Sequence, residues 1–109
     1  MTAPDDNHAA DTTRAARRRL LESMPKAELH LHLDGSLRIA TAIELARTRG
    51  IEAPDGWFGM SEALVGEMPG VSQAELLKRF DLPIALMQDA EALERIAAEL
   101  VEDLSLIHI

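Results

Sequence analysis

The fold is decided by ten residues that read Lys26-Ala27-Glu28-Leu29-His30-Leu31-His32-Leu33-Asp34-Gly35. Polar and apolar side chains alternate strictly through this stretch, and a period of two residues is typical of a β-strand. Successive side chains point to opposite faces of a strand, so the ionisable residues share one face and the aliphatic residues share the other. We therefore predict a strand that ends at Gly35 and has one face suited to a layer of helices.

The residues after the predicted strand repeat with the period of an α-helix. Apolar residues recur at i, i+3, i+4 and i+7 from Ile39 to Ala46, and Gly50 is placed to end this helix. Residues 51–59 contain Pro54 and an Asp-Gly pair, so we expect a loop there. A short helical turn is expected over residues 61–66.

Two further helices are indicated by residues at their N-termini. Ser72 and Glu75 have the spacing of a capping box, which predicts a helix that runs to about Phe80. Pro83 suits the first turn of a following helix. Asp89 is the expected N-cap of the longest helix, whose apolar stripe consists of Leu93, Ile96, Ala97, Leu100, Val101 and Leu104.

The composition of the 109 residues is that of a globular protein, with 47% hydrophobic and 28% charged residues. The chain has no cysteine, so a metal ion would have to be bound by histidines and carboxylates. The net charge of −8 provides no electrostatic footprint for nucleic acid. No apolar run approaches the ~20 residues that cross a bilayer, so no membrane partner is expected.

Residues 1–23 are expected to form a disordered N-terminal tail. They contain no apolar residue larger than alanine between Met1 and Leu20, and acidic residues balance their arginines. This composition fits neither a secretory signal nor a transit peptide, so we expect a cytoplasmic protein.

His30 and His32 are the candidate metal ligands. Neighbours on one face of a strand lie about 6.6 Å apart, a gap that two imidazoles can span to reach one ion. The same pattern also suits a strand whose polar face is exposed to water. For Glu28 we expect an interior carboxylate that is hydrogen-bonded. The order of strand, turn and helix favours the metal site, because the strand ends of an α/β barrel carry its chemistry.

A single strand cannot form a sheet by itself, because its backbone donors and acceptors lack partners. Barrels of parallel strands and helices need about 250 residues. We therefore expect the chain to be the N-terminal portion of a longer protein.

The stretch from Pro25 to Arg38, with His-Leu-His-Leu-Asp-Gly-Ser-Leu at its centre, resembles the first strand and turn of the adenosine deaminase family. This is a family of zinc hydrolases in the amidohydrolase superfamily, and the similarity covers residues 24–104. It implies an α/β fold, a (β/α)8 TIM-type barrel of which this chain supplies the first strand and the following helices. It also implies zinc-dependent deamination of adenosine and 2′-deoxyadenosine in purine salvage, with inosine and ammonia formed from adenosine.

The resemblance implies roles for three residues. His30 and His32 would bind Zn²⁺, His32 would also border the substrate, and Asp34 would contact the ribose 5′-hydroxyl. The chain would hold no catalytic residue, because the proton donor and the remaining metal ligands of the family lie on later strands. A helix over the pocket would carry Leu76, Leu77 and Phe80.

Residues 105–109 match nothing in the family, so we expect a truncated end there and interpret His108 as accidental. The chain alone is expected to be inactive, because two histidines do not complete a catalytic zinc site. Two alternatives stay open. One is a deaminase of adenine or of a modified adenosine, although Asp34 favours adenosine. The other is a non-enzymatic helical interaction module in which the His-x-His pattern is coincidental.

Overall fold

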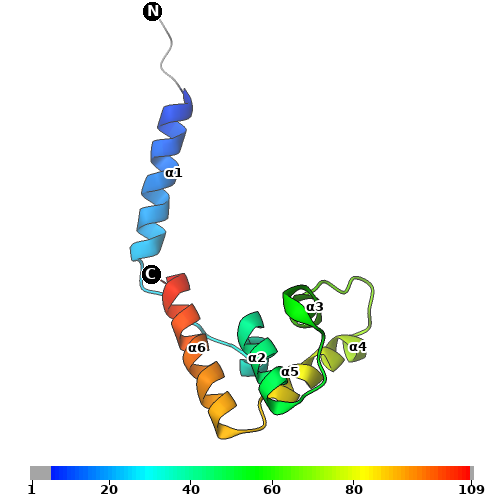
Figure 1. The fold of residues 1–109 in the computed structure, drawn as a ribbon. Helices are drawn as coiled ribbons and strands as arrows, with labels where there is room; N and C mark the ends of the chain where they lie inside the picture. Colours follow the sequence, from blue (N-terminus) through cyan, green and yellow to red (C-terminus); the bar gives the residue numbers. More distant parts are fainter. Residues whose placement is uncertain (1–5, 109) are drawn as a thin grey trace, which may run out of the picture.

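The computed structural model describes the backbone of residues 6–108 and the side chains of residues 9–106. The chain folds into helices joined by short loops (Figure 1). In chain order the elements are α1 (Asp6–Ser23), the 3₁₀ turn η1 (Leu33–Gly35), α2 (Ile39–Arg49), α3 (Gly56–Leu64), α4 (Gln73–Leu77), the 3₁₀ turn η2 (Lys78–Phe80), α5 (Asp81–Leu86) and α6 (Ala90–His108).

The segment from Pro25 to His32, for which we predicted a β-strand, is extended but pairs with no other strand in residues 6–108. At His32 the backbone has φ −115° and ψ 121°, within the β region. A strand requires a neighbour that supplies hydrogen bonds, and the other described elements are helices, which satisfy their backbone groups internally. The predicted α/β fold, with the first strand of a (β/α)8 barrel, is therefore wrong for this structure.

Several predicted helix ends are confirmed. Gly50 ends α2 in the left-handed conformation (φ 62°), and its N–H donates to the carbonyl of Ala46. Glycine adopts this conformation without steric cost. The capping box at α4 is also complete, because the Ser72 hydroxyl accepts from the Glu75 N–H and the Glu75 carboxylate accepts from the Ser72 N–H.

Helix α3 begins at Gly56, inside the stretch that we predicted to be a loop. Its residue Met60 is 1% exposed and lies in the core beside α2. Packing of α3 on α2 stabilises helical structure there despite Pro54 and the Asp-Gly pair that follows it. The local turn residues did not reveal this contact because it depends on residues that lie elsewhere in the chain.

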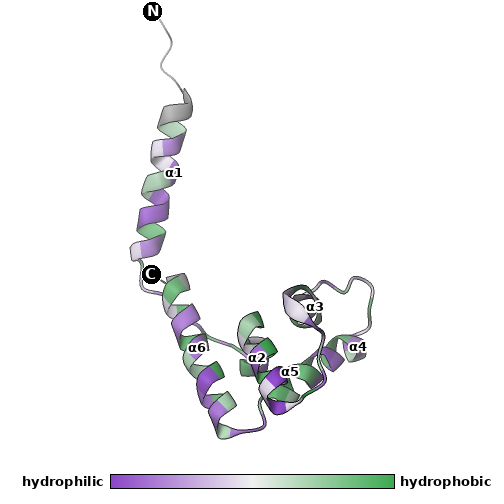
Figure 2. Cartoon of the chain, viewed as in Figure 1, coloured by the Kyte–Doolittle hydropathy of each residue, from purple (hydrophilic) through white to green (hydrophobic). Residues whose placement is uncertain are grey.

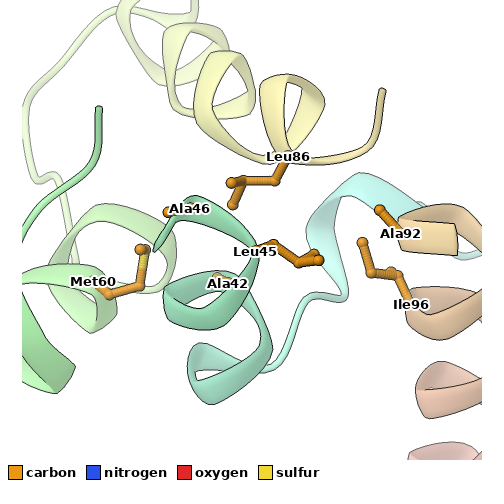
Figure 3. Close-up of a cluster of buried hydrophobic side chains, with 7 residues drawn as sticks. All are labelled: Ala42, Leu45, Ala46, Met60, Leu86, Ala92 and Ile96. Carbon is orange, nitrogen blue, oxygen red and sulfur yellow. The ribbon is translucent and has the colours of Figure 1, made fainter. Parts of the chain in front are cut away.

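The hydrophobic core is centred on α2 (Figure 3). Leu45 points toward α6, and Leu86 of α5 lies above the same face of α2. Small alanines at the helix contacts let these backbones approach closely. The buried members are Ala42, Leu45, Ala46, Met60, Leu86, Ala92 and Ile96.

Ion pairs connect α2 to α6 at three positions among the described side chains. Arg38, just before α2, pairs with Asp103; Glu44 pairs with Arg95; and Arg49 pairs with Asp89, just before α6. As the residue number rises along α2, the number of the partner residue falls along α6, so the two helices run antiparallel. Thr41, buried beside these pairs, donates its hydroxyl to Glu99.

Helix α1 lies where we expected a disordered tail, of which residues 1–5 are outside the described residues. It projects away from the other helices (Figure 1), and hydrophilic residues cover most of it (Figure 2). Every described side chain from residue 9 to residue 32 is exposed. The radius of gyration is accordingly 20.1 Å, whereas a compact chain of this length has about 13 Å.

Helix α6 continues through the end that we expected not to match the family. Its backbone is helical to His108, whose side chain, like the whole of Ile109, is outside the described residues. Among the described helices, none combines the length and the apolar content needed to cross a membrane.

Candidate functional site

His30 and His32 lie side by side on the extended segment. Their Nε2 atoms are 3.0 Å apart, and their ring centroids are 5.1 Å apart with an interplanar angle of 31°. An extended backbone places residues i and i+2 on the same side even without a neighbouring strand. The predicted pairing of the two imidazoles is therefore present, although the sheet is not.

This pair fits the donor set of a zinc site in part. Zinc–nitrogen bonds are about 2.0–2.1 Å long, so two ring nitrogens 3.0 Å apart can contact one ion. A catalytic zinc site has three protein ligands and an open position. Among the described residues, however, no group of three or more His, Cys, Asp and Glu side chains lies close enough together to bind a metal. The side chains of residues 9–106 thus supply at most part of a site.

Glu28 does not have the interior position that we considered for it. It is exposed, and its carboxylate accepts a hydrogen bond from the backbone N–H of His30 at 3.3 Å. This contact supports the extended conformation before the histidine pair.

Asp34 lies in the turn η1, immediately after the histidine pair. One of its carboxylate oxygens is 4.0 Å from Nδ1 of His32, and its side chain is 30% exposed. The turn is closed by the His32 carbonyl, which accepts hydrogen bonds from the Gly35 N–H at 3.1 Å and the Ser36 hydroxyl at 2.7 Å. These bonds orient Asp34 toward the helices rather than along the extended segment.

Asp34 also lines a pocket of about 400 Å³ between η1 and the helices that follow α3. The ring of Phe80 lies against Gly35, because a Cβ built on this glycine would be 3.9 Å from Phe80 Cε1. Of the residues expected over the pocket, Leu76 and Phe80 line it, whereas Leu77 is not among the lining residues and is 56% exposed. A mostly apolar wall with the carboxylate of Asp34 and the guanidinium of Arg79 suits a ligand that is partly apolar and partly polar.

His32 lines a second pocket, of about 450 Å³, on the other side of Asp34. Its apolar wall comes from the α5–α6 region and is made of Ile84, Met87 and Leu93. His30 lines neither pocket. The structure thus brings His32 and Asp34 together at one pocket, and the ring of His30 lies beside that of His32.

Arg79 is a residue that the sequence reasoning missed. It lines the pocket beside Asp34 and donates hydrogen bonds to the Gly66 carbonyl and the Met68 sulfur. It precedes Phe80 in the 3₁₀ turn η2 and is partly buried. Its partners lie in a separate loop, so no local signal in the sequence indicated its place.

The sequence profile of the adenosine deaminase family matches residues 25–106 of this chain. The chain belongs to the adenosine deaminase family. This confirms the resemblance seen in the sequence. The match includes the histidine pair and Asp34, and it leaves the whole of α1 outside.

Individual relatives agree with this family assignment. An adenosine deaminase of Clostridium perfringens is 49% identical over 86 residues, which cover 78% of this chain and 26% of the relative. Adenosine deaminases of Vibrio vulnificus and Shewanella halifaxensis are 46% and 43% identical over 81 residues, 73% of this chain and 24% of each relative. The chain therefore spans about a quarter of the length of these curated relatives. No solved structure matches the chain.

Proposed function

We propose that this chain is part of a zinc-dependent enzyme that hydrolyses the 6-amino group of adenosine and 2′-deoxyadenosine, with inosine and ammonia as the products from adenosine. The observation that carries the proposal is the family match over residues 25–106. Within this range the Nε2 atoms of His30 and His32 lie 3.0 Å apart. The proposed reaction belongs to purine salvage, in the cytoplasm.

His30 and His32 are the proposed zinc ligands. Neutral imidazole nitrogens are common zinc donors, and the two Nε2 atoms already face each other. When bound, zinc lowers the pKa of a coordinated water to about 7 and so supplies hydroxide at neutral pH. His32 also borders the pocket beside Asp34, so we place it next to the substrate.

Asp34 is the proposed partner of the ribose 5′-hydroxyl. A carboxylate accepts a hydrogen bond from a hydroxyl more strongly than a neutral oxygen does. Asp34 is held at the edge of both pockets by the turn η1, within reach of a ligand beside His32. Leu76 and Phe80 offer apolar surface for the uncharged part of a nucleoside.

The 109-residue chain by itself is expected to be inactive, because its two histidines leave a catalytic zinc site short of ligands. The test compares the deaminase activity of this chain with that of a protein of the relatives' length that includes it. Absorbance measures the conversion of adenosine to inosine. We expect turnover only by the longer protein. Deamination by the short chain would contradict this expectation.

Variants of the longer protein test the residue roles. His30→Ala and His32→Ala should lose most of the zinc and nearly all of the activity, whereas Asp34→Ala should keep its zinc and raise KM for adenosine about tenfold or more. Glu52→Gln, in an exposed loop, is the matched control. Full zinc occupancy in both histidine variants would refute the ligand assignment. Faster turnover of adenine than of adenosine would refute the role of Asp34.

A further inference from the structure

Arg38 lies where the turn with Asp34 joins α2, and it makes the densest set of charged contacts to α6. Its Nη2 atom is 2.7 Å from Asp103 Oδ1, and its Nε atom is 3.2 Å from both oxygens of that carboxylate. Nη2 also donates to Glu102 at 3.0 Å and to the Glu99 carbonyl at 3.3 Å. A guanidinium that binds a carboxylate through two nitrogens fixes orientation as well as distance.

Hydrogen bonds hold the backbone on both sides of the short link between His32 and Arg38. The Arg38 carbonyl accepts from the Ala42 N–H at 2.9 Å, which anchors this residue to the first turn of α2. Two residues earlier, the Ser36 hydroxyl donates to the His32 carbonyl, and the Ser36 N–H donates to the Leu33 carbonyl at 3.1 Å. The backbone from His32 to Arg38 is thus held at one end by the turn and at the other by α6.

We propose that the Arg38–Asp103 ion pair positions the turn that carries His32 and Asp34 and thereby sets the geometry of the metal and nucleoside site. This inference rests on the proposed function. Arg38 is a positioning residue, since its guanidinium contacts α6 and acts on His32 only through the backbone of the turn.

The other ion pairs between α2 and α6 separate this role from general stability. Glu44–Arg95 joins the same two helices at 2.9 Å but lies at the middle of α2, away from the turn. Its partly exposed side chains, 50% and 37%, are comparable in burial to those of Arg38 and Asp103, 35% and 39%. Loss of either pair should weaken the α2–α6 contact, whereas only loss of Arg38 should release the turn.

The test uses the 109-residue chain and compares Arg38→Gln with the matched control Glu44→Gln. The first measurement is amide hydrogen exchange without metal at Gly35 and Ser36, whose N–H groups close the turn. We expect Arg38→Gln to speed exchange about tenfold at these two amides, as for the loss of hydrogen bonds to a charged group, while Glu44→Gln leaves them unchanged. The second measurement is the Zn²⁺ affinity, by calorimetry, of a protein of the relatives' length that includes this chain, which should fall about tenfold in Arg38→Gln, as for the loss of an outer-shell support.

Asp103→Asn supplies a second variant that keeps Arg38 and its contacts to Glu102 and Glu99. It should reproduce the effect of Arg38→Gln at the turn. The double variant should add little to either single variant, because both changes remove the same Arg38–Asp103 ion pair. Equal exchange rates at Gly35 and Ser36 in the Arg38→Gln and Glu44→Gln variants would overturn the proposal. Full zinc occupancy of the longer protein in both the His30→Ala and His32→Ala variants would overturn the ligand assignment of the proposed function, whereas hydrogen exchange at Gly35 and Ser36 decides the positioning role independently of zinc.

Discussion

His32 has two structural roles, one for its backbone carbonyl and one for its imidazole. Its carbonyl closes the turn η1, and its imidazole lies against that of His30. The position of the imidazole beside that of His30 was predictable from the alternation of polar and apolar residues, because side chains alternate in direction along any extended backbone. The role of the carbonyl depends on Gly35 and Ser36, whose hydrogen bonds turn the chain from the extended segment toward α2.

The capping box at α4 predicts a shift in one carboxyl group. The Ser72 backbone N–H and hydroxyl both donate to Glu75 and lower the pKa of its carboxyl below the ordinary value. Ser72→Ala removes the hydroxyl, so the pKa of Glu75 should rise toward its ordinary value, and Ser72→Thr should keep it low. NMR titration of the Glu75 carboxyl measures this, and an unchanged titration in Ser72→Ala would contradict it.

Leu86 is the core residue whose truncation should be most damaging. Its side chain is 0% exposed and packs above α2. Leu86→Ala should lower the free energy of unfolding by roughly 2–5 kcal/mol, because it removes buried apolar surface and leaves a cavity. Urea unfolding compares it with Leu77→Ala, which truncates a side chain that is 56% exposed. Similar losses in the two variants would contradict the assignment of the core.

At the scale of elements, the charged contacts between α2 and α6 complement a narrow apolar contact. Leu45 faces Ile96 and Ala92 between the two helices, and ion pairs flank this contact at both ends. Apolar burial is not directional, so it brings the helices together without setting their register. The ion pairs, with partners at matched steps along both helices, specify the antiparallel register.

The start of α6 predicts a dependence of stability on pH. The Arg49 guanidinium and the Ala92 N–H hold the pKa of Asp89 at about 2, below its ordinary value of 3.8. The unfolded chain therefore takes up a proton on Asp89 at a higher pH than the folded chain does. The stabilisation is complete above pH ~4–5 and is lost as the pH falls toward 2.

Asp89→Asn removes this proton uptake. The free energy of unfolding should be lower than in wild type at pH 7 and should decline less between pH 5 and pH 2. Circular dichroism melts across this range measure both effects, with Asp55→Asn as the control because Asp55 makes no side-chain cap at α3. A decline as steep in Asp89→Asn as in wild type would contradict the prediction.

At the scale of the whole molecule, the chain consists of a helical unit and a projecting arm. The helical unit holds the buried residues, which come from α2, α3, α5 and α6. The arm consists of α1 and the extended segment, whose described side chains are exposed. The histidine pair lies where the arm meets the helical unit, so its surroundings depend on both parts.

Removal of residues 1–23 should change the shape of the chain without changing its stability. The described side chains of α1 are exposed and contribute nothing to the core, so the melting temperature should stay nearly constant. The radius of gyration should fall from 20.1 Å toward the ~12–13 Å of a compact chain. Small-angle X-ray scattering and thermal melts measure the two quantities. A marked drop in melting temperature would show that α1 packs against the helical unit.

The sequence by itself determined the features that depend on residues close together along the chain. The capping box of Ser72 and Glu75, the end of α2 at Gly50 and the face shared by His30 and His32 each follow from a few neighbouring residues. The family resemblance was also carried by a short stretch, residues 25–38, and the family match confirms it.

Only the tertiary structure decided the features that join distant residues. Whether the segment before η1 becomes a strand depends on a partner backbone, and residues 6–108 supply none. The start of α3 depends on burial of Met60 against α2, and Arg38 finds Asp103 across 65 positions of the chain. Such contacts form only when packing brings two helices together, so no local pattern in the sequence specifies them.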